Sequence, residues 1–346
     1  MKIVHVVLSR GFAGSERSTA ESSNQQCKNH QVWVVVRNDH RKNGKSIVDH
    51  LDKSVQIIQV PSKLFTGRAL AKEIHRIQPD IIHCHLRRST RLVSRLKTDA
   101  ATLSTLHITV NGKHFNKMDG LICNAKWQLA DIPSDYSGEV FKANNSLVPH
   151  RRLLSDEVKN LRRDLGIQEN DYLIGAVGRY HKSKAWDTLI AAFKQVPEFT
   201  HAKLLFFGSG SLEQPLKEQA AGDERINFVG FKDNIKDYYQ TFDLAACPSR
   251  FEPLPRVMLE ALDGGAPLIA SDAGGCLELI EDYGGTAFAV DDVEELTSKL
   301  RILLENPPPK HRPDLTAHYV ENANAAMEKF YQRLIENKRK QLKTTA

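Results

Sequence analysis

Residues 243–275, DLAACPSRFEPLPRVMLEALDGGAPLIASDAGG, contain a complete strand–helix–strand unit. The apolar runs at 243–249 and 267–272 have the length of buried strands, and the run at 255–262 between them has helical spacing. Pro255 suits the start of that helix, because a proline lacks the N–H group that would have no partner there. Strands joined in this way lie parallel in one sheet, so the unit predicts an α/β fold.

The same alternation extends along the chain and begins afresh after NNSLVPHRRLL at 144–154. Near-continuous Val and Ile runs separated by helices indicate parallel sheets that are covered on both faces. We therefore expect two Rossmann-like, doubly wound α/β domains, 1–153 and 154–314, that face a cleft. Strands are expected at 2–9, 32–37, 55–60, 80–86, 101–108, 120–125, 172–180, 202–210, 226–230, 243–249, 267–272 and 286–290, and helices at 68–78, 89–97, 185–196, 212–222, 255–262 and 293–306.

Length and composition restrict the class of protein. The chain has 346 residues, enough for two domains, and five scattered cysteines, an odd number that favours free thiols in a reducing compartment. It has no apolar run long enough for a transmembrane helix. Its start, MKIVHVVLSRG, predicts a first strand and not a signal peptide.

Charge is divided unevenly between the halves. Residues 1–160 hold 25 Lys+Arg and 14 Asp+Glu, a net charge of +11, and the remainder hold 23 and 28, a net charge of −5. A basic half is compatible with nucleic acid, an anionic membrane surface or a phosphorylated ligand. Nucleic acid is the least favoured partner, because the basic segments lack interleaved aromatic residues and no nucleic-acid motif is present.

Ligands of open α/β sheets bind beyond the carboxyl ends of the strands, so strand-to-helix loops carry the candidate chemistry. The first such loop, SRGFAGSERST at 9–19, contains Gly11 and Gly14, which allow a close backbone approach. Ser15 could cap the next helix, whose free N–H groups suit a phosphate. A plain tight turn explains this loop equally well.

Two loops of the second domain are also candidates. Arg179 and Lys184 follow a buried strand within six residues. Such a pair of cations either binds a diphosphate or lies exposed on a solvated loop. Gly208 and Gly210 follow the next strand, where a plain turn is favoured over a contact with a base or ribose.

Two carboxylates flank the start of the helix at 255–262. Glu252 precedes it, and Glu260 lies about one and a half turns inside it, with a side chain that leans back toward the N-terminus. Both carboxylates are therefore expected to reach one space, where they would accept hydrogen bonds from a polyhydroxylated ligand. The alternative is one carboxylate favoured by the helix dipole and one exposed helical glutamate.

These motifs occur in an order that resembles a known family. GSER, PDIIHCH, TLH, VGRYHKSKAWDTLI, GSGSLEQPL, CPSRFEPLPRVMLEAL and GGAPLIASDAGGCLELI are similar in order and spacing to motifs of the family-four (group 1) retaining, nucleotide-sugar-dependent glycosyltransferases. The resemblance is contiguous over about 172–305 and sparser over the first half. It implies the GT-B architecture, in which the last helix crosses back, so residues 315–346 are expected to join the first domain.

The resemblance also implies roles for individual residues. Arg179 and Lys184 would hold the donor diphosphate and stabilise the leaving nucleotide. Glu252 would contact hydroxyl groups of the transferred sugar, and His107 would reach the sugar near the reacting carbon, which makes these four the expected catalytic residues. The expected donor-binding residues are Gly14, Gly208, Gly210, Pro253, Leu254, Glu260 at the ribose and Glu278 near the base.

The implied activity is transfer of a hexosyl group, with retention, from a nucleotide sugar to a surface glycan or lipid-linked saccharide such as lipopolysaccharide or capsule. The enzyme would be cytoplasmic and in part peripheral on the inner face of the membrane. It would need no cofactor and no metal, and the sequence has no D-x-D triplet. Two alternatives stay open: a nucleotide-sugar epimerase of the same fold, and a non-catalytic protein that binds sugar nucleotides.

The sequence departs from the family pattern at three places. Pro253-Leu254-Pro255 stands where Gly-Phe-Gly is common, so backbone N–H groups near the sugar are lost. Ala185 follows Lys184, and Ala13 precedes the second glycine of the first loop, where the family has glycine. These changes leave the charged residues in place and bear on the choice of donor sugar.

The first domain has two further features. His83 and His85 share one face of a strand, but two histidines are too few for a closed metal site, so no metal is expected, and His85 is expected to face the acceptor. Arg87, Arg91 and Arg95 recur every four residues and form a cationic stripe. This stripe is either a solvated helix face or a contact with an anionic membrane or a phosphate-bearing acceptor.

Overall fold

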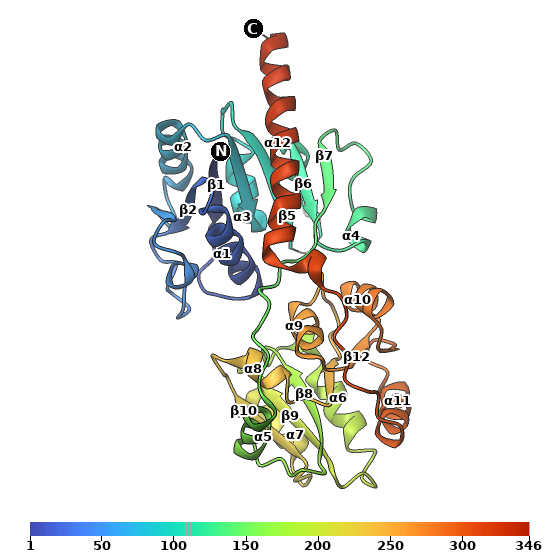
Figure 1. The fold of residues 1–346 in the computed structure, drawn as a ribbon. Helices are drawn as coiled ribbons and strands as arrows, with labels where there is room; N and C mark the ends of the chain where they lie inside the picture. Colours follow the sequence, from blue (N-terminus) through green and yellow to red (C-terminus); the bar gives the residue numbers. More distant parts are fainter. Residues whose placement is uncertain (108, 111, 346) are drawn as a thin grey trace. The chain divides into compact units, whose positions relative to one another are not determined.

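The computed structural model describes residues 1–107, 109–110 and 112–345. It divides into two compact units, Met1–Val148 with Thr316–Ala346, and Pro149–Leu315 (Figure 1). Each unit contains one parallel sheet covered by helices, which confirms the predicted pair of Rossmann-like α/β domains.

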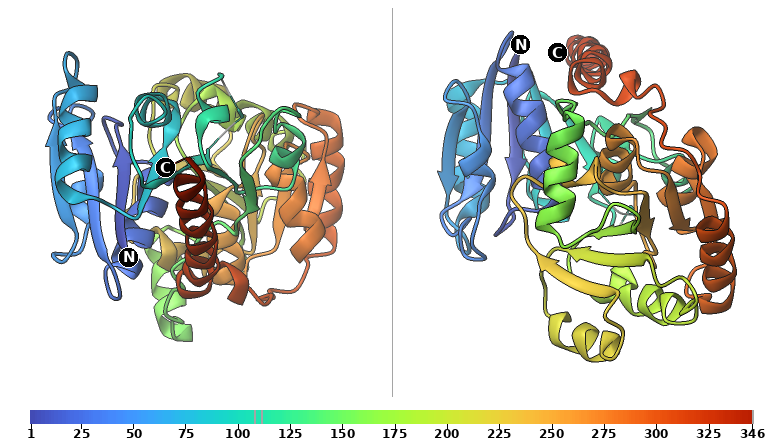
Figure 2. Two further views of the ribbon diagram at one scale, coloured as in Figure 1. Left: turned by 90° about the horizontal axis from the view of Figure 1, so that it is seen from above. Right: turned by 60° about the horizontal axis from the view of Figure 1, so that its bottom comes forward.

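The first unit has a seven-stranded sheet of order β3-β2-β1-β4-β5-β6-β7. Helices α2 and α3 pack in the apolar cluster on one face, and α1 and α12 pack in the cluster on the other, where they contact each other (Figure 2). Its elements are β1 (Lys2–Val7), α1 (Gly14–Gln26), β2 (Gln31–Arg37), η1 (Ile47–His50), β3 (Gln56–Val60), α2 (Thr66–Ile77), β4 (Ile81–His85), α3 (Leu86–Val93), β5 (Ala101–Leu106), η2 (Phe115–Lys117), β6 (Gly120–Cys123), α4 (Trp127–Ala130), β7 (Glu139–Lys142), η4 (Thr316–His318) and α12 (Val320–Thr345).

The second unit has a six-stranded sheet of order β10-β9-β8-β11-β12-β13. Helices α6, α7 and α11 share one apolar cluster with the sheet, while α8 and α9 pack on each other. Its elements are α5 (Ser155–Asp164), β8 (Tyr172–Val177), η3 (Lys182–Lys184), α6 (Trp186–Phe193), β9 (Ala202–Phe207), α7 (Glu213–Ala220), β10 (Ile226–Gly230), α8 (Ile235–Tyr239), β11 (Leu244–Cys247), α9 (Arg256–Gly264), β12 (Leu268–Ser271), α10 (Gly275–Tyr283), β13 (Thr286–Phe288) and α11 (Val293–Glu305).

Several predicted boundaries shift. Pro255 is the N-cap of α9 and not its first residue, and the predicted strand at 101–108 ends at Leu106, with residue 108 outside the described residues. Ser15 does not cap α1, because the N-cap is Ala13. The side chain of Glu16 takes the capping role, since its Oε2 accepts the Ala13 N–H at 3.0 Å.

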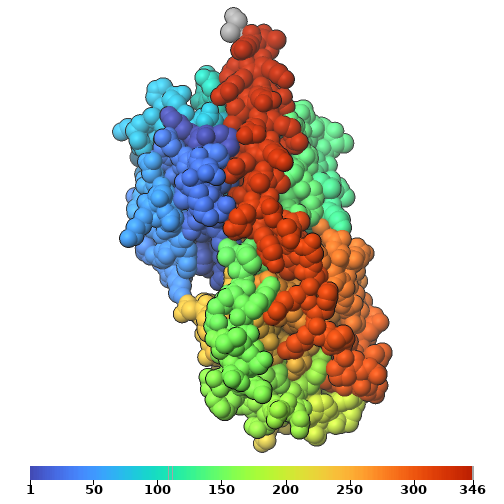
Figure 3. Space-filling view, viewed as in Figure 1, coloured from blue at the N-terminus to red at the C-terminus, as the bar shows by residue number. Residues whose placement is uncertain are grey.

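Helix α12 returns the end of the chain to the first unit. Figure 3 shows it lying across the surface of that unit, and its inner side buries Phe330, Tyr331, Leu334 and Ile335 in the same cluster as strands β1 and β2. None of the described helices is both long and apolar enough to cross a bilayer.

The docking of α12 gives a stability prediction. Phe330→Ala should lower the free energy of unfolding by about 3–5 kcal/mol, because it opens a cavity where the ring packs against the sheet. Urea unfolding followed by tryptophan fluorescence measures this. The control is Gln332→Ala on the exposed side of the same helix, which should change stability by less than about 0.5 kcal/mol. An equal effect of both substitutions would contradict the docking of α12.

Candidate functional site

Three of the four predicted loops lie at the switch points of the two sheets. Strand order reverses between β1 and β4 in the first unit and between β8 and β11 in the second. At such a point successive crossovers go to opposite faces, and the loops that follow the two strands diverge. Loop 9–19 follows β1, the loop that carries Arg179 and Lys184 follows β8, and Glu252 follows β11.

The two cations of the loop after β8 differ in exposure: Arg179 is exposed, and Lys184 is largely buried. Arg179 is exposed, and its guanidinium makes no ion pair with another described residue, while its carbonyl accepts the Trp186 Nε1–H at 2.9 Å. Lys184 ends the short helix η3 and is followed by Ala185 in the left-handed conformation, φ 51°. This conformation costs a non-glycine residue about 1–2 kcal/mol, which explains why the family pattern has glycine there.

Lys184 and Glu252 form a buried ion pair. Their side chains are 17% and 11% exposed, and Glu252 Oε1 also accepts the Ser249 hydroxyl at 3.1 Å. Burial lowers the pKa of Lys184, but the charge and hydrogen bond of Glu252 outweigh burial and raise its pKa overall. Lys184 is therefore a cation at neutral pH, and the structure brings two of the predicted catalytic residues into direct contact.

Arg250 is a residue that the sequence analysis did not single out. Its guanidinium donates to the Lys182 carbonyl at 2.5 Å and pairs with Asp187 at 2.7 Å and Asp291 at 2.8 Å. Its backbone N–H donates to the Ser183 carbonyl at 2.9 Å. Arg250 thus joins the loop after β11 to the loop that carries Lys184 and fixes their spacing.

The two predicted glycines after β9 have a packing role beyond a plain turn. A Cβ atom on Gly208 would lie 1.9 Å from the Gly178 carbonyl oxygen, and one on Gly210 would lie 2.4 Å from the Tyr180 carbonyl oxygen. Only glycine allows these backbones to approach so closely. The loop after β9 therefore supports the segment that contains Arg179.

The remaining donor-side residues lie around α9 and α10. Glu260 is buried in α9, with Oε1 3.7 Å from Arg256 Nη2, so the structure gives Glu252 and Glu260 different cationic partners. Glu278 is buried in the first turn of α10. Leu254 is buried, and Pro253 presses its carbonyl against α10, where a Cβ atom on Gly275 would lie 2.1 Å from it.

A pair of thiols lies close to the Lys184–Glu252 ion pair. Cys247 and Cys276 are buried, with their sulfur atoms 3.9 Å apart, and all five cysteines are free, as the sequence predicts. The sequence did not predict this contact, because Cys247 lies in β11 and Cys276 in α10, 29 residues apart.

In the first unit the structure gathers four histidines. His83 and His85 stack with ring centroids 4.2 Å apart, as expected for one strand face, and His5 of β1 joins them. His85 was expected to face the acceptor, but its ring is 5% exposed and both nitrogens bond inside the unit. Direct contact between His85 and an acceptor does not fit this burial. His107, which follows β5 and is only partly buried, lies next to His85, with its Nε2 3.4 Å from His85 Nδ1.

His5 raises the number of clustered histidine ligands to three, which corrects the expectation of two. Their nearest ring nitrogens lie within 4.8 Å of one another. However, His83 Nδ1 and Nε2 already bond Tyr331 and Thr105 at 2.6 Å, and stacked rings do not direct their lone pairs to one point. The geometry therefore favours a hydrogen-bonded cluster over a metal centre.

Gly14 and Arg87 both lie just after the carboxyl end of a strand of the first sheet, at the starts of α1 and α3. The space beside Gly14 is open, since a Cβ atom there would meet nothing within 4 Å. Arg87 and Arg91 are exposed on α3, and Arg95 is exposed just beyond its end. Burial lowers the pKa of His114, and the charges of these three arginines lower it further.

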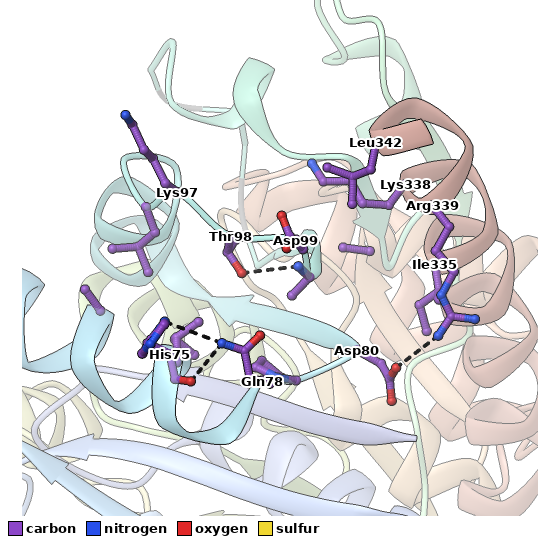
Figure 4. A pocket seen from close by; sticks show the side chains of 16 residues that line it. His75, Gln78, Asp80, Lys97, Thr98, Asp99, Ile335, Lys338, Arg339 and Leu342 are labelled. Carbon is purple, nitrogen blue, oxygen red and sulfur yellow. Dashed lines mark hydrogen bonds and ion pairs between the residues drawn. The ribbon is translucent and has the colours of Figure 1, made fainter. Parts of the chain in front are cut away.

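A surface pocket of the first unit lies elsewhere. It is lined at the amino ends of β4 and β5, next to α12, and Figure 4 shows Asp80 facing Arg339 across it, 3.3 Å apart. None of the residues predicted for the site lines this pocket.

The buried ion pair gives a prediction for the second unit. Lys184→Met should lower the free energy of unfolding by about 3–5 kcal/mol, because it leaves the Glu252 carboxylate buried without its cation. The double variant Lys184→Met/Glu252→Gln should lose clearly less than the sum of the two single losses. Urea unfolding followed by tryptophan fluorescence, to which Trp186 of this unit contributes, measures this coupling. Additive losses would contradict the pair, and the exposed Lys182→Met serves as the matched control.

Comparisons with known proteins give a family match in the second half of the chain and several relatives. Residues 157–325 match the family model of glycosyl transferases group 1. An uncharacterized glycosyltransferase of Methanocaldococcus jannaschii is 34% identical over 156 residues, 44% of this chain and 40% of that protein. The O-antigen biosynthesis glycosyltransferase WbnH of Escherichia coli is 34% identical over 124 residues, 36% of this chain and 35% of that protein. The chain thus spans less than half the length of these curated relatives.

Solved structures match over the whole chain. HepE of Anabaena, solved with UDP and glucose, superposes with a TM-score of 0.74 at 20% identity and covers 99% of this chain and 100% of its own. WaaG, a glycosyltransferase involved in lipopolysaccharide biosynthesis, superposes with a TM-score of 0.69 at 18% identity over 97% and 98% of the two chains. The fold is therefore the GT-B fold of these enzymes, and residues 157–325 belong to the glycosyl transferases group 1 family.

Proposed function

We propose that this protein is a retaining glycosyltransferase that moves a hexosyl group from a nucleotide sugar to a surface glycan or lipid-linked saccharide. The observation that carries the proposal is the buried Lys184–Glu252 pair beside the exposed Arg179 at the switch point of the second sheet. A cation held next to a carboxylate suits a ligand in which a diphosphate adjoins sugar hydroxyl groups. HepE, which shares the fold, binds UDP and UDP-glucose.

In the proposed reaction, the bond between the anomeric carbon and the diphosphate oxygen breaks with oxocarbenium-like character. Negative charge grows on the departing diphosphate, where Lys184 and Arg179 stabilise it. Glu252 exchanges part of its contact with Lys184 for hydroxyl groups of the sugar. The acceptor oxygen then bonds to the same face of the sugar, and its proton passes to the leaving phosphate.

We propose that no metal or cofactor takes part. Two side-chain cations are available for the diphosphate, and the sequence has no D-x-D triplet to hold a divalent ion. We place the enzyme in the cytoplasm, where nucleotide sugars and free thiols are both found.

We also propose that the first unit docks on an anionic membrane that carries the acceptor. Leu64 and Phe65 are 75% and 64% exposed at the tip of the loop between β3 and α2. Arg68 lies over the Phe65 ring at 5.5 Å, and Arg88 of α3 donates to the Ser62 carbonyl at 2.7 Å, which ties this tip to the helix of the arginine stripe. Exposed apolar side chains beside cations suit the surface of an anionic bilayer.

Release of free nucleotide from a panel of UDP-, GDP- and ADP-sugars, with and without lipid-linked saccharides, tests the activity. Arg179→Ala should lower turnover by about 10²- to 10³-fold, because the developing charge loses a cation. Lys184→Ala and Glu252→Ala should lower it at least as much.

The exposed Arg179 can be replaced without loss of folding, so its variant separates chemistry from stability. Lys182→Ala on the same loop should stay within about twofold of the parent. Full activity of the Arg179 and Glu252 variants would overturn the site. Turnover of a donor to its epimer without acceptor would favour an epimerase, and binding without turnover a non-catalytic protein.

Sedimentation with vesicles tests the membrane surface. Binding should be stronger to phosphatidylglycerol than to phosphatidylcholine vesicles and should fall about tenfold in Leu64→Ser/Phe65→Ser, which loses the exposed apolar tip. Val140→Ser, at the opposite edge of the sheet, should bind like the parent. Equal binding of all three proteins would exclude the tip as the membrane contact.

A further inference from the structure

Hydrogen bonds link His107 to helix α12 through the interior of the first unit. His107 Nε2 lies 3.4 Å from His85 Nδ1, and His85 Nε2 lies 3.0 Å from His5 Nδ1. His5 Nε2 lies 2.8 Å from Gln26 Oε1, and Gln26 Nε2 lies 3.0 Å from Asn324 Oδ1. The series runs from His107, just after β5, through β4, β1 and α1 to α12 without leaving the unit.

The three histidines in this series are neutral at pH 7. Burial lowers the pKa of His5 and of His107 to about 4, against weaker opposing contributions from Gln26 and Glu16. Burial and neighbouring histidines hold the pKa of His85 well below its usual value. A neutral imidazole has one N–H and one lone pair, so each ring passes on the direction of the hydrogen bond that it receives.

A main-chain carbonyl fixes one end of the series. Asn324 Nδ2 lies 2.8 Å from the Val320 carbonyl oxygen, which can only accept. The Asn324 amide must therefore direct its NH₂ group to that oxygen and its Oδ1 to Gln26. Gln26 must then donate through Nε2, so its Oε1 faces His5 and accepts from it.

From this end the direction continues to His107. His5 donates through Nε2 and therefore keeps a lone pair on Nδ1. His85 donates to that lone pair through Nε2 and keeps its own lone pair on Nδ1. Thr19 Oγ1 lies 3.1 Å from this nitrogen but also 2.8 Å from the Ser15 carbonyl, which competes for its hydrogen. An N–H on His107 Nε2 avoids two opposed lone pairs at this contact.

We infer that Asn324, Gln26, His5 and His85 form a directional hydrogen-bond chain that holds His107 in the Nε2–H tautomer. The lone pair of His107 Nδ1 is then the group that meets the ligand, and it accepts a hydrogen bond from a hydroxyl group of the transferred sugar. This second statement rests on the proposed function, whereas the tautomer does not. Asn324, Gln26, His5 and His85 are positioning residues, and His107 is the one member of this series that touches the sugar.

The chain explains why polar side chains occupy the core at this face of the sheet. His5, Gln26, His85 and Asn324 are each at most 5% exposed, and apolar residues could fill such positions at less cost in desolvation. A fully bonded series has one favoured set of hydrogen positions, because reversing any ring would oppose two donors or two acceptors.

Two-bond ¹H–¹⁵N correlation spectra of protein labelled with ¹⁵N-histidine distinguish N–H from lone-pair nitrogens, and His107→Gln assigns the His107 signals. In the unmodified protein we expect the Nε2–H tautomer of His107 to exceed the other by about ten to one, the bias that one strong neutral hydrogen bond supplies. In Gln26→Met, the ratio should fall toward that of an unconstrained neutral histidine, which by itself favours the Nε2–H form less strongly. Asn324→Leu should act in the same direction from another helix, and Gln25→Met, which changes a neighbouring residue bonded to Lys28 at the surface, should leave the ratio as it was.

A proton on Nδ1 of His107 in the unmodified protein would overturn the chain, as would an unchanged ratio in Gln26→Met. Addition of the donor that gives the greatest turnover should shift the Nδ1 resonance and leave Nε2 in place, and a shift of Nε2 alone would overturn the sugar contact. If no nucleotide sugar is turned over, the proposed function fails, while the spectrum without donor still decides the tautomer.

Discussion

Parallel strands place all their carboxyl ends at one edge of a sheet, and the order of the second sheet reverses between β8 and β11. The crossovers that follow these two strands go to opposite faces, so their loops diverge and leave side chains from both strands at one place. Lys184 after β8 and Glu252 after β11 meet there, although 68 residues separate them. Everything proposed about the reaction depends on this reversal.

The spacing of the two loops is held by polar contacts and by close backbone packing. Arg250 bonds both to the Lys184 loop and to the acidic residues around it, while Gly208 and Gly210 let a third loop lie directly against Gly178 and Tyr180. The buried pair would be costly if either partner were absent. These contacts hold the two loops that carry the Lys184 cation and the Glu252 carboxylate at a fixed spacing.

In the first unit, buried polar side chains lie inside a packed core and bond to one another. Its histidines lie on adjacent strands, and the chain of bonds through His5 and Gln26 ends on α12, the helix that returns from the far end of the sequence. The docking of α12 thus has two effects. It covers the sheet with Phe330 and its neighbours, and it supplies the Asn324 amide that gives the histidine series its direction.

The sequence by itself determined the two parallel α/β domains, because Val- and Ile-rich runs that alternate with amphipathic segments have few other ways to bury their apolar faces. It also predicted that Arg179, Lys184 and Glu252 lie in loops that follow parallel strands, where ligands of such sheets bind. It missed β7, whose four residues EVFK have no apolar run, and it assigned the α1 cap to Ser15, although Glu16 bonds the capping N–H. Only the tertiary structure decided that Arg250 would join two loops, that Cys247 would meet Cys276, and that His85 would be buried against His5 instead of facing an acceptor. These contacts depend on strand register and on helices that approach from distant parts of the chain, and neither composition nor spacing along the sequence encodes those distances.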